Sequence, residues 1–560
     1  MKFVTSQLMY FLQNKMTKRN IRLLFKILLI ISFTIALYSI LFHFIMEYEG
    51  RKYSCITGLY WTLTTMSTLG FGDITFTSDL GRLFSSFVLL SGIVFLLVML
   101  PFTFIRFFYA PWLEAQSQSR TPRELPFNTS GHVIITNFDP VSTSLIEKLK
   151  QYNFPYVIAL TDQQRASELY DMNYRVVVGD LDRPETYKRL RIENAALLVV
   201  NNDDMLNTNI ISTVRELSEN VPIVTSADAE DSVDILQLAG ATHVFQFTRM
   251  LGESLARHAP GVSTKANIIG RFGPLLIAEA PVMRTPFEGK KLIESRLRET
   301  AGVNVVGIWQ RGKFEIPNAD TLIHPASILL LAGSDEQFKK YDKLTGSFLT
   351  FSTPVVILGG GRVGQAVASA LAERGIDYRI VEKKKHLIED SKKYILGSAA
   401  DINTLIQAGI NEGPAVFITT HDDDINIYLT IYCRKLRADM QIISRANLDR
   451  NINTLYSAGA DLVMSYASMG ANSIINILKP DEILMLAEGL NIFRMHVPSS
   501  LIGKPLYDTK IREKTGCNVV AIHSHDTFSI NPDPSVLLMK DEELILIGTA
   551  EAEKKFMQNL

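Results

Sequence analysis

Residues 68–73 read TLGFGD and lie between two long apolar stretches. Two glycines alternate with larger residues in this hexapeptide, and glycine adopts positive φ at little steric cost. The alternation lets successive backbone carbonyls face one axis, where rings of carbonyl oxygens can replace the water shell of a potassium ion. One chain supplies one wall of such a pore, so four chains are expected to meet. The predicted selectivity filter consists of Thr68, which adds a hydroxyl at the inner end, Leu69, Gly70, Phe71, Gly72 and Asp73.

The flanking stretches have the lengths that a membrane requires. Residues 27–45 carry His43 as their only ionisable side chain, and residues 83–105 form an uncharged run of 23 residues. About 20 apolar residues cross the ~30 Å hydrocarbon core, which predicts an outer helix at 27–45 and an inner helix at 83–105. Residues 56–67 are too short to span and suit a re-entrant pore helix. The predicted pore domain covers residues 27–110.

The charge pattern of the N-terminal segment gives the orientation. Residues 1–26 hold six lysines and arginines and no acidic residue, which by the positive-inside rule places them in the cytoplasm, as a helix lying along the lipid surface. The chain is therefore expected to be a multi-pass protein of the cell (plasma) membrane. Because it crosses the membrane twice, both of its termini are expected in the cytoplasm. Gly92, in the middle of the inner helix, is predicted as a gating hinge, with close helix packing as an equal alternative.

A duplication fills the rest of the chain, after a polar, proline-containing linker predicted at 111–130. VVILGGGRVG from Val355 matches VIITNFDPVS from Val133 in pattern, and VFITTHDDDIN from Val416 matches LLVVNNDDMLN from Leu197 at an offset of 219 residues. Each copy alternates short β-branched runs with helical patterns, which predicts a parallel sheet of βαβ units. Two α/β Rossmann-like domains are therefore expected, at 131–265 and 351–480.

A shorter module follows each copy. The modules share GVNVVGI from Gly302 and GCNVVAI from Gly516, and both end in a strand-rich stretch. They are predicted as small α+β lobes at 266–350 and 481–560. Because they lack clustered titratable residues, they suit dimerisation or ligand sensing better than catalysis.

The second copy carries a dinucleotide fingerprint. Gly359, Gly361 and Gly364 have GxGxxG spacing directly after an apolar strand, and they open an alanine-rich helix whose N-terminus would hold a pyrophosphate. Glu382 ends the next apolar run, YRIVE, about 20 residues later, where an acidic residue bonds the ribose hydroxyls. This pattern favours NAD over NADP as the ligand. ADP and ATP remain alternative ligands, because the fingerprint recognises the AMP half that they share with NAD. The neighbouring Lys383–Lys385 run could instead accept a 2′-phosphate, but a solvated turn is the preferred interpretation.

Five further residues complete the predicted nucleotide site. Arg445 could clamp a phosphate, whereas the first copy has Ser226 in the corresponding place. Asp401 could reach the adenine or ribose, with a helix cap as a competing role. The remaining candidates are Arg362, Val363 and Thr419.

The first copy breaks the fingerprint. Asn137, Asp139 and Ser142 occupy its three glycine positions. Their Cβ atoms and the acidic side chain would oppose a pyrophosphate, so no dinucleotide is expected there.

A metal site is not identified by the sequence. Acidic clusters could bind Ca²⁺, but none has EF-hand spacing, so solvated loops are the preferred interpretation and the metal ligands stay unknown. Three scattered cysteines give no disulfide framework or metal-ligand spacing, and a net charge of −1 gives no basic bias toward nucleic acid. The acidic clusters are Asp203 with Asp204; Glu230, Asp231 and Asp234; and Asp422, Asp423 and Asp424.

With this filter, two membrane helices and duplicated Rossmann-like domains, the chain resembles prokaryotic two-transmembrane potassium channels gated by regulator-of-K⁺-conductance (RCK) domains. The resemblance implies a ligand-gated homotetramer, whose eight RCK units form a gating ring that pulls on the inner helices through the linker. The filter departs from the family's common TVGYGD at Leu69 and Phe71. Phe71 lacks the hydroxyl that in relatives ties the filter to pore-helix aromatics, here Tyr60 and Trp61, which puts filter rigidity in question rather than selectivity.

Two other classes of function are weighed against the channel. A membrane-anchored NAD-dependent oxidoreductase would need an acid or base near the nicotinamide, and the small lobes offer none, so no enzyme is expected. A regulatory subunit of a separate ion transporter would need no filter of its own.

Overall fold

The computed structural model describes residues 15–109, 121–259, 265–283, 285–310, 313–325, 327–345, 353–388, 392–479, 483–485, 490–524 and 527–559. Residues 1–14 of the predicted cytoplasmic segment and residues 110–120, which include the first half of the predicted linker, lie outside these ranges.

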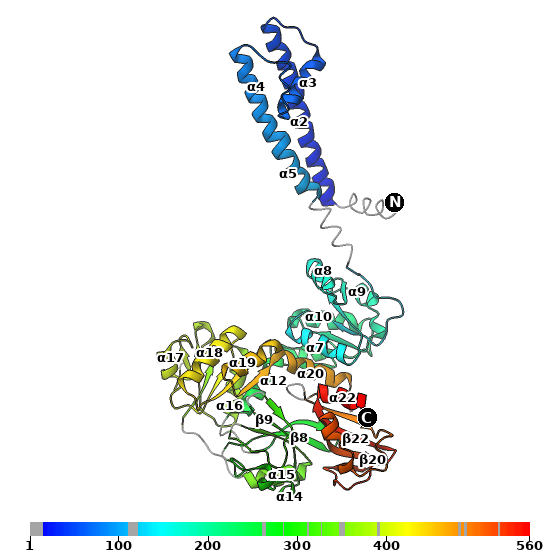
Figure 1. Ribbon diagram of the computed structural model, residues 1–560, viewed down its shortest axis with the longest axis vertical. Coiled ribbons are helices and arrows are strands. Elements are labelled where there is room, and N and C mark those ends of the chain that lie inside the picture. Colours follow the sequence, from blue (N-terminus) through cyan, green and yellow to red (C-terminus); the bar gives the residue numbers. More distant parts are fainter. Residues whose placement is uncertain are drawn as a thin grey trace. The chain divides into compact units, whose positions relative to one another are not determined.

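The pore unit is built on two long apolar helices, α2 (Lys15–Tyr48) and α4 (Asp79–Gly92), which lie side by side (Figure 1). Two spans are long and apolar enough to cross a membrane: Phe25–Tyr48 within α2, and Asp79–Phe104, which begins with α4 and continues beyond it. Helix α2 extends beyond the predicted 27–45 at both ends, and the inner stretch begins at Asp79, before the predicted start at residue 83. The inner helix begins early because the Ser78 hydroxyl caps it, accepting the Gly81 N–H at 3.1 Å.

The inner helix changes its winding below Gly92. A π-helical segment (Ile93–Met99), α5 (Leu100–Phe104) and a second π-helical segment (Ile105–Tyr109) continue it. The predicted pore helix is α3 (Cys55–Met66), and Ser54 caps it. An aromatic core joins this helix to its neighbours, because the Phe42 and Trp61 rings stack at 4.9 Å and Phe76 meets Trp61 edge-on at 5.1 Å.

Each copy of the duplication forms a six-stranded parallel sheet with the doubly wound strand order. In the first copy the order is β3 (Val176–Val178), β2 (Tyr156–Leu160), β1 (Val133–Ile135), β4 (Leu197–Val200), β5 (Ile223–Ser226) and β6 (His243–Phe245). Its helices are α7 (Pro140–Gln151), α8 (Gln163–Asp171), α9 (Pro184–Arg189), α10 (Asp204–Arg215), α11 (Ser232–Leu238) and α12 (Phe247–Arg257).

The second copy repeats this plan. Its order is β14 (Tyr394–Leu396), β13 (Tyr378–Glu382), β12 (Val355–Leu358), β15 (Ala415–Ile418), β16 (Gln441–Ala446) and β17 (Leu462–Ser465). Its helices are α16 (Arg362–Glu373), α17 (Ile402–Gln407), α18 (Asp423–Leu436), α19 (Ile452–Ala458) and α20 (Tyr466–Leu478). In such sheets ligands bind at the carboxyl ends of the strands where the order reverses, here between β12 and β15.

A five-stranded antiparallel lobe follows each copy. The first has the order β10 (Lys313–Glu315), β9 (Asn304–Gln310), β11 (Ile328–Gly333), β8 (Leu275–Pro281) and β7 (Asn267–Phe272), with α13 (Leu292–Ser295), α14 (Leu297–Thr300) and α15 (Asp335–Thr345). The second has the order β18 (Ile483–Met485), β19 (Leu490–His496), β22 (Glu542–Thr549), β20 (Asn518–Ser524) and β21 (Thr527–Ile530), with α21 (Ile511–Thr515) and α22 (Ala550–Asn559). The predicted fold class of a helical membrane domain, two Rossmann-like domains and two α+β lobes is confirmed.

The last helix of each copy packs on the other copy. Helix α12 lies against α16, where a Cβ added at Gly252 would come within 2.4 Å of the Ala366 Cβ. Helix α20 lies against α7, where a Cβ at Gly470 would come within 2.8 Å of Val141. This exchange of helices joins the two copies through a shared apolar core.

Candidate functional site

Backbone geometry in residues 68–73, the predicted filter, follows the expected alternation. Thr68, Gly70 and Gly72 have φ of +62°, +43° and +75°. Every second residue is thus left-handed, which turns neighbouring carbonyls toward the same side. Glycine adopts this conformation freely, whereas Thr68 is β-branched and strained there. Strain at this position fits a residue whose conformation serves the pore rather than the stability of the fold.

Pore-helix aromatics support the filter although Phe71 has no hydroxyl. The Tyr60 hydroxyl donates to the Asp73 carboxylate at 3.2 Å, and the Tyr60 and Phe71 rings stack with centroids 6.4 Å apart. The Trp61 Nε1–H donates to the Ile74 carbonyl at 3.1 Å. Tyr60 and Trp61 are thus bonded to Asp73 and Ile74, the residues that follow Phe71 and Gly72.

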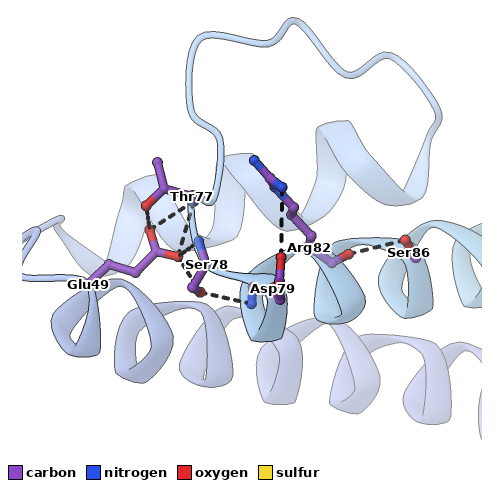
Figure 2. A network of polar contacts seen from close by, with 7 residues as sticks. Glu49, Thr77, Ser78, Asp79, Arg82 and Ser86 are labelled. Atoms are coloured by element: carbon purple, nitrogen blue, oxygen red, sulfur yellow. Dashed lines mark hydrogen bonds and ion pairs between the residues drawn. The ribbon is translucent and has the colours of Figure 1, made fainter.

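A carboxylate at the end of α2 fixes the start of the inner helix (Figure 2). Glu49 accepts hydrogen bonds from the Thr77 N–H at 3.1 Å and the Ser78 N–H at 2.8 Å, and also from both hydroxyls. The Ser78 side chain and backbone, and then Thr77, hold the pKa of Glu49 at about 2. Sequence reasoning did not identify Glu49, because a lone acidic residue in a polar turn carries no local signal.

Gly92 is in close contact with the pore helix. A Cβ added there would come within 2.3 Å of the Met66 carbonyl oxygen and 2.4 Å of the Met66 Cα. These are backbone atoms at the C-terminal end of α3, so they cannot rotate away. The position therefore requires glycine for packing, which was one of the two predicted roles.

In the second copy, the glycine motif forms an open turn at the N-terminus of α16. Gly359 has φ of +108°, and a Cβ on Gly364 would come within 1.9 Å of the Gly359 carbonyl oxygen, so both positions require glycine. A Cβ on Gly361 would meet nothing within 4 Å, and no side chain from the described part of the chain caps the helix that follows. The first N–H groups of α16, those of Arg362, Val363 and Gly364, are thus free for an anion.

Glu382 lies beside this turn at the end of β13, buried with a 7 % exposed side chain. Its two carboxylate oxygens accept the Gly360 N–H at 2.7 Å and the Lys384 N–H at 2.8 Å. Since a carboxylate has about four acceptor positions, capacity remains for hydroxyl donors of a ligand.

A cavity of about 1010 Å³ opens over the turn and collects most of the predicted residues. Gly359, Gly361, Arg362, Val363, Glu382, Thr419 and Arg445 line it. Thr419 also holds the turn, because its hydroxyl donates to the Gly359 carbonyl at 2.9 Å. Asp401 is not part of the lining. Its carboxylate caps α17 by accepting the N–H groups of Asn403 and Thr404, which is the competing role considered for it.

Arg445 faces this cavity as a buried cation. Its guanidinium donates to the Asn447 Oδ1 at 3.0 Å and lies 5.4 Å from the centre of the Tyr466 ring. Its Nε has no partner among the described atoms, and burial lowers the pKa of the guanidinium. A buried cation with an unused donor is suited to hold a phosphate.

In the first copy, side chains of the copy itself occupy the N-terminus of α7, which corresponds to the N-terminus of α16. Asp139 caps α7 by accepting the Ser142 N–H at 2.8 Å, and it also accepts the Asn201 side-chain amide. The Asn201 Oδ1 accepts the Ser226 hydroxyl, and Asn137 donates to the Asn201 carbonyl at 2.6 Å. Burial raises the pKa of Asp139. An internal carboxylate thus lies where a pyrophosphate would lie.

Members of the acidic clusters bind backbone N–H groups or an arginine side chain. Asp204 accepts the N–H groups of Asp228 and Ala229, and Asp423 accepts those of Asn447 and Leu448. Glu230 pairs with Arg249 at 2.5 Å. Within the described ranges, no three acidic, histidine or cysteine side chains converge on a metal position.

Several lining residues of the cavity were not predicted. Tyr466, His421 and Asn447 of the second copy are among them, and His421 lies in the repeated stretch VFITTHDDDIN without having been assigned a role. Asp139, Pro140 and Thr248 come from the first copy and reach the cavity because α12 and α20 are exchanged. This contribution could not be seen in a motif confined to one copy.

Known families match nearly all of the described architecture. An ion channel family covers residues 26–109, the TrkA-N domain covers 133–247 and 355–466, and the TrkA-C domain covers 277–346 and 491–560.

Among solved structures, the GsuK channel bound to NAD is 37 % identical with a TM-score of 0.60, over 96 % of this chain and 99 % of that one. The chain belongs to the RCK potassium channels. Potassium channel protein 1 of Methanocaldococcus jannaschii is 25 % identical over 53 % of this chain and 90 % of its own. Probable potassium channel protein 2 of the same organism is 25 % identical over 41 % and 73 %. The channel class, rather than the enzyme class, is the one that these relatives support.

Proposed function

We propose that this RCK channel is gated by an adenine nucleotide, NAD first among them, bound in the cavity of its second copy. The observation that carries the proposal is the uncapped N-terminus of α16 beneath the open Gly361 position. In the first copy the Asp139 carboxylate fills the same position. One copy thus keeps an anion site that the other has closed.

The polar groups around the turn fit the parts of a dinucleotide. Glu382, as an acceptor, suits the ribose hydroxyls and disfavours a 2′-phosphate, and Arg445 is suited to a phosphate. A volume of about 1010 Å³ is large enough for such a ligand. NAD in the GsuK relative supports this choice, while ADP and ATP share the half that the fingerprint recognises.

Gating requires that the nucleotide bind two shapes of the cytoplasmic part with different affinity. We propose a homotetramer in which eight RCK units, two from each chain, form a ring that pulls on the inner helices through the linker. Coupling of ~1–3 kcal/mol per site, summed over four chains, would suffice to move the pore between mostly closed and mostly open.

The membrane arrangement completes the proposal. Residues 68–73 would select potassium, and both termini would lie in the cytoplasm. The linker and domain limits predicted from the sequence are part of the same proposal.

Single-channel recording of the purified protein in a planar bilayer tests this function. NAD⁺, NADH, ADP, ATP and Ca²⁺ are applied in turn to the cytoplasmic side. Potassium current from this protein alone and a change in open probability with a nucleotide are expected. Without current, the regulatory-subunit class would be favoured. Hydride transfer by the purified protein would restore the enzyme class, and a response to Ca²⁺ alone would contradict nucleotide gating.

A matched pair of variants locates the site. Gly361→Asp should abolish the nucleotide response and leave conductance intact, because its carboxylate would occupy the anion position. Ser369→Asp places the same charge on an exposed position of the same helix and should respond like the wild type. An unchanged response in Gly361→Asp would refute the assigned site.

A further inference from the structure

A second cavity, of about 380 Å³, lies between the exchanged helices α12 and α20, above strands β7 and β8. Equivalent positions of the two copies line it in pairs, each pair separated by 219 residues. The pairs are Met250 with Met469, Glu253 with Asn472, Ser254 with Ser473, and Arg257 with Asn476. Both copies thus contribute equivalent positions of their last helices to one cavity.

The last of these pairs differs in its hydrogen bonding. The Asn476 side-chain amide is hydrogen-bonded to the backbone of Met485: it accepts the Met485 N–H at 2.7 Å and donates to the Met485 carbonyl at 3.2 Å. Arg257, its counterpart, has a buried Nε without a partner. Among the described residues, the rest of its guanidinium has neither a hydrogen bond nor an ion pair. Burial lowers the pKa of Arg257, as expected for a cation short of partners.

The acidic residues of the cavity are already paired. Glu253 binds Arg249 with 2.9 Å between Oε1 and Nε, and Glu279 binds the His258 Nε2 at 2.7 Å. Although burial alone would raise the pKa of Glu279, His258 and then Arg257 hold it below its ordinary value. Arg257 is therefore the guanidinium of this cavity that lacks a hydrogen-bonded anion. A planar guanidinium fork binds a carboxylate with two parallel hydrogen bonds.

Apolar side chains line one part of the cavity, beside serine and asparagine side chains that carry no charge. Four methionines contribute, and methionine side chains adjust to ligands of different shape. A dianion such as a phosphate monoester would meet repulsion from Glu253 and Glu279, whereas a single negative charge is balanced by Arg257. The volume is at the small end of ligand cavities. The methionines are Met250, Met464, Met469 and Met485.

We propose that this cavity binds a small aliphatic monocarboxylate, whose carboxylate pairs with Arg257 and whose chain lies among the methionines. The ligand would touch the first copy through α12, the second copy through α20, the first lobe through β7 and β8, and the second lobe through Met485 of β18. It would therefore bias the arrangement of four domains at once. This site is separate from the glycine-motif cavity and does not depend on the proposed nucleotide.

Calorimetry on the full-length protein in detergent tests the proposal with hexanoate as the probe. Hexanoate should bind. Two compounds with the same chain serve as controls: hexanol, which has no charge, and hexylamine, which has the opposite charge. Both should bind at least about tenfold more weakly, as expected for the loss of a charge-assisted hydrogen bond. No binding of hexanoate up to millimolar concentration, or equal binding of hexanol, would overturn the proposal. Tighter binding of hexyl phosphate would overturn the assignment to a monocarboxylate.

Arg257→Asn reproduces the residue of the second copy and is the critical variant. It should lose hexanoate binding by about tenfold or more, while the exposed Arg183→Asn should not. An unchanged NAD affinity and melting temperature establish that Arg257→Asn is folded. If that folded variant keeps the hexanoate affinity of the wild type, Arg257 is not the anion partner and the proposal fails.

Discussion

Arg362 and Asp228 form an ion pair that joins the glycine-motif helix of the second copy to the first copy. Arg362 is the first residue of α16, and Asp228 follows β5. Both side chains are more than half exposed, at 58 % and 56 %. Since a guanidinium also binds phosphate, a nucleotide and Asp228 would compete for the same group. The pair is therefore placed to relay occupancy of one copy to the other.

Removing Asp228 should tighten nucleotide binding. In Asp228→Asn, Arg362 becomes free for the phosphates, and the affinity measured by calorimetry should rise by up to about fivefold, the scale of an exposed ion pair. Asp234→Asn changes an exposed charge of the same copy and should leave the affinity unchanged. No gain in Asp228→Asn would show that Arg362 does not meet the phosphates.

The closed first copy predicts a binding stoichiometry. Wild-type protein should bind one nucleotide per chain, because Asp139 and Asn201 fill the first copy with their own hydrogen bonds. Gly361→Asp should bind none. Titration calorimetry or equilibrium dialysis measures both values, and a second site of matching affinity would contradict this account of the first copy.

Glu49 should stabilise the pore unit in a pH-dependent manner. Its pKa of about 2 lies below the ordinary value of 4.5, so its stabilising effect is complete above about pH 4.5 and is lost as the pH falls through about 2. The difference in melting temperature between wild type and Glu49→Gln should therefore stay constant from neutral pH to about pH 5 and shrink below it. Glu47→Gln, at an exposed position two residues earlier, serves as the control and should show no such difference.

The Tyr60 hydroxyl should prolong conduction. Tyr60→Phe keeps the ring beside Phe71 but removes the 3.2 Å bond to Asp73, a loss of about 1 kcal/mol. Macroscopic potassium current under maintained activation should then decay severalfold faster. Tyr53→Phe removes a hydroxyl from another pore-unit tyrosine, which packs on Phe42, and should leave the decay unchanged. Equal decay in both variants would argue that other bonds hold the filter.

Local patterns were sufficient to predict the domain plan and the turn that opens α16. Positive φ at Gly70 and Gly72 and the close contacts of Gly364 follow from local chain geometry, which a motif records directly. Asp401 could not be decided in this way, because the same carboxylate can cap a helix or face a ligand. The structure shows it capping α17.

Other features depend on contacts between distant segments. Asp228 reaches Arg362, and Asp139 lines the cavity of the second copy, because the last helices of the two copies are exchanged. No residue spacing within one copy encodes that exchange. Arg257 was missed for the same reason, since an arginine at the end of a helix looks like a solvated C-terminal charge until its surroundings are known.

Gly92 allows the two roles predicted for it to be separated. In Gly92→Ala the new methyl group would lie 2.3 Å from the Met66 carbonyl oxygen, so the inner helix must move away from the pore helix, at a cost of about 1–3 kcal/mol. Packing therefore predicts a destabilised pore with little current, even when the cytoplasmic domains are folded and bind nucleotide normally. If Gly92 acts only as a hinge, Gly92→Ala should have normal stability and conductance but an altered open probability, because alanine stiffens a helix without breaking it. Ser91→Ala, which removes only a hydroxyl bonded to the Val88 carbonyl within the same helix, is the matched control. Melting temperature and single-channel conductance of the two variants decide between the roles.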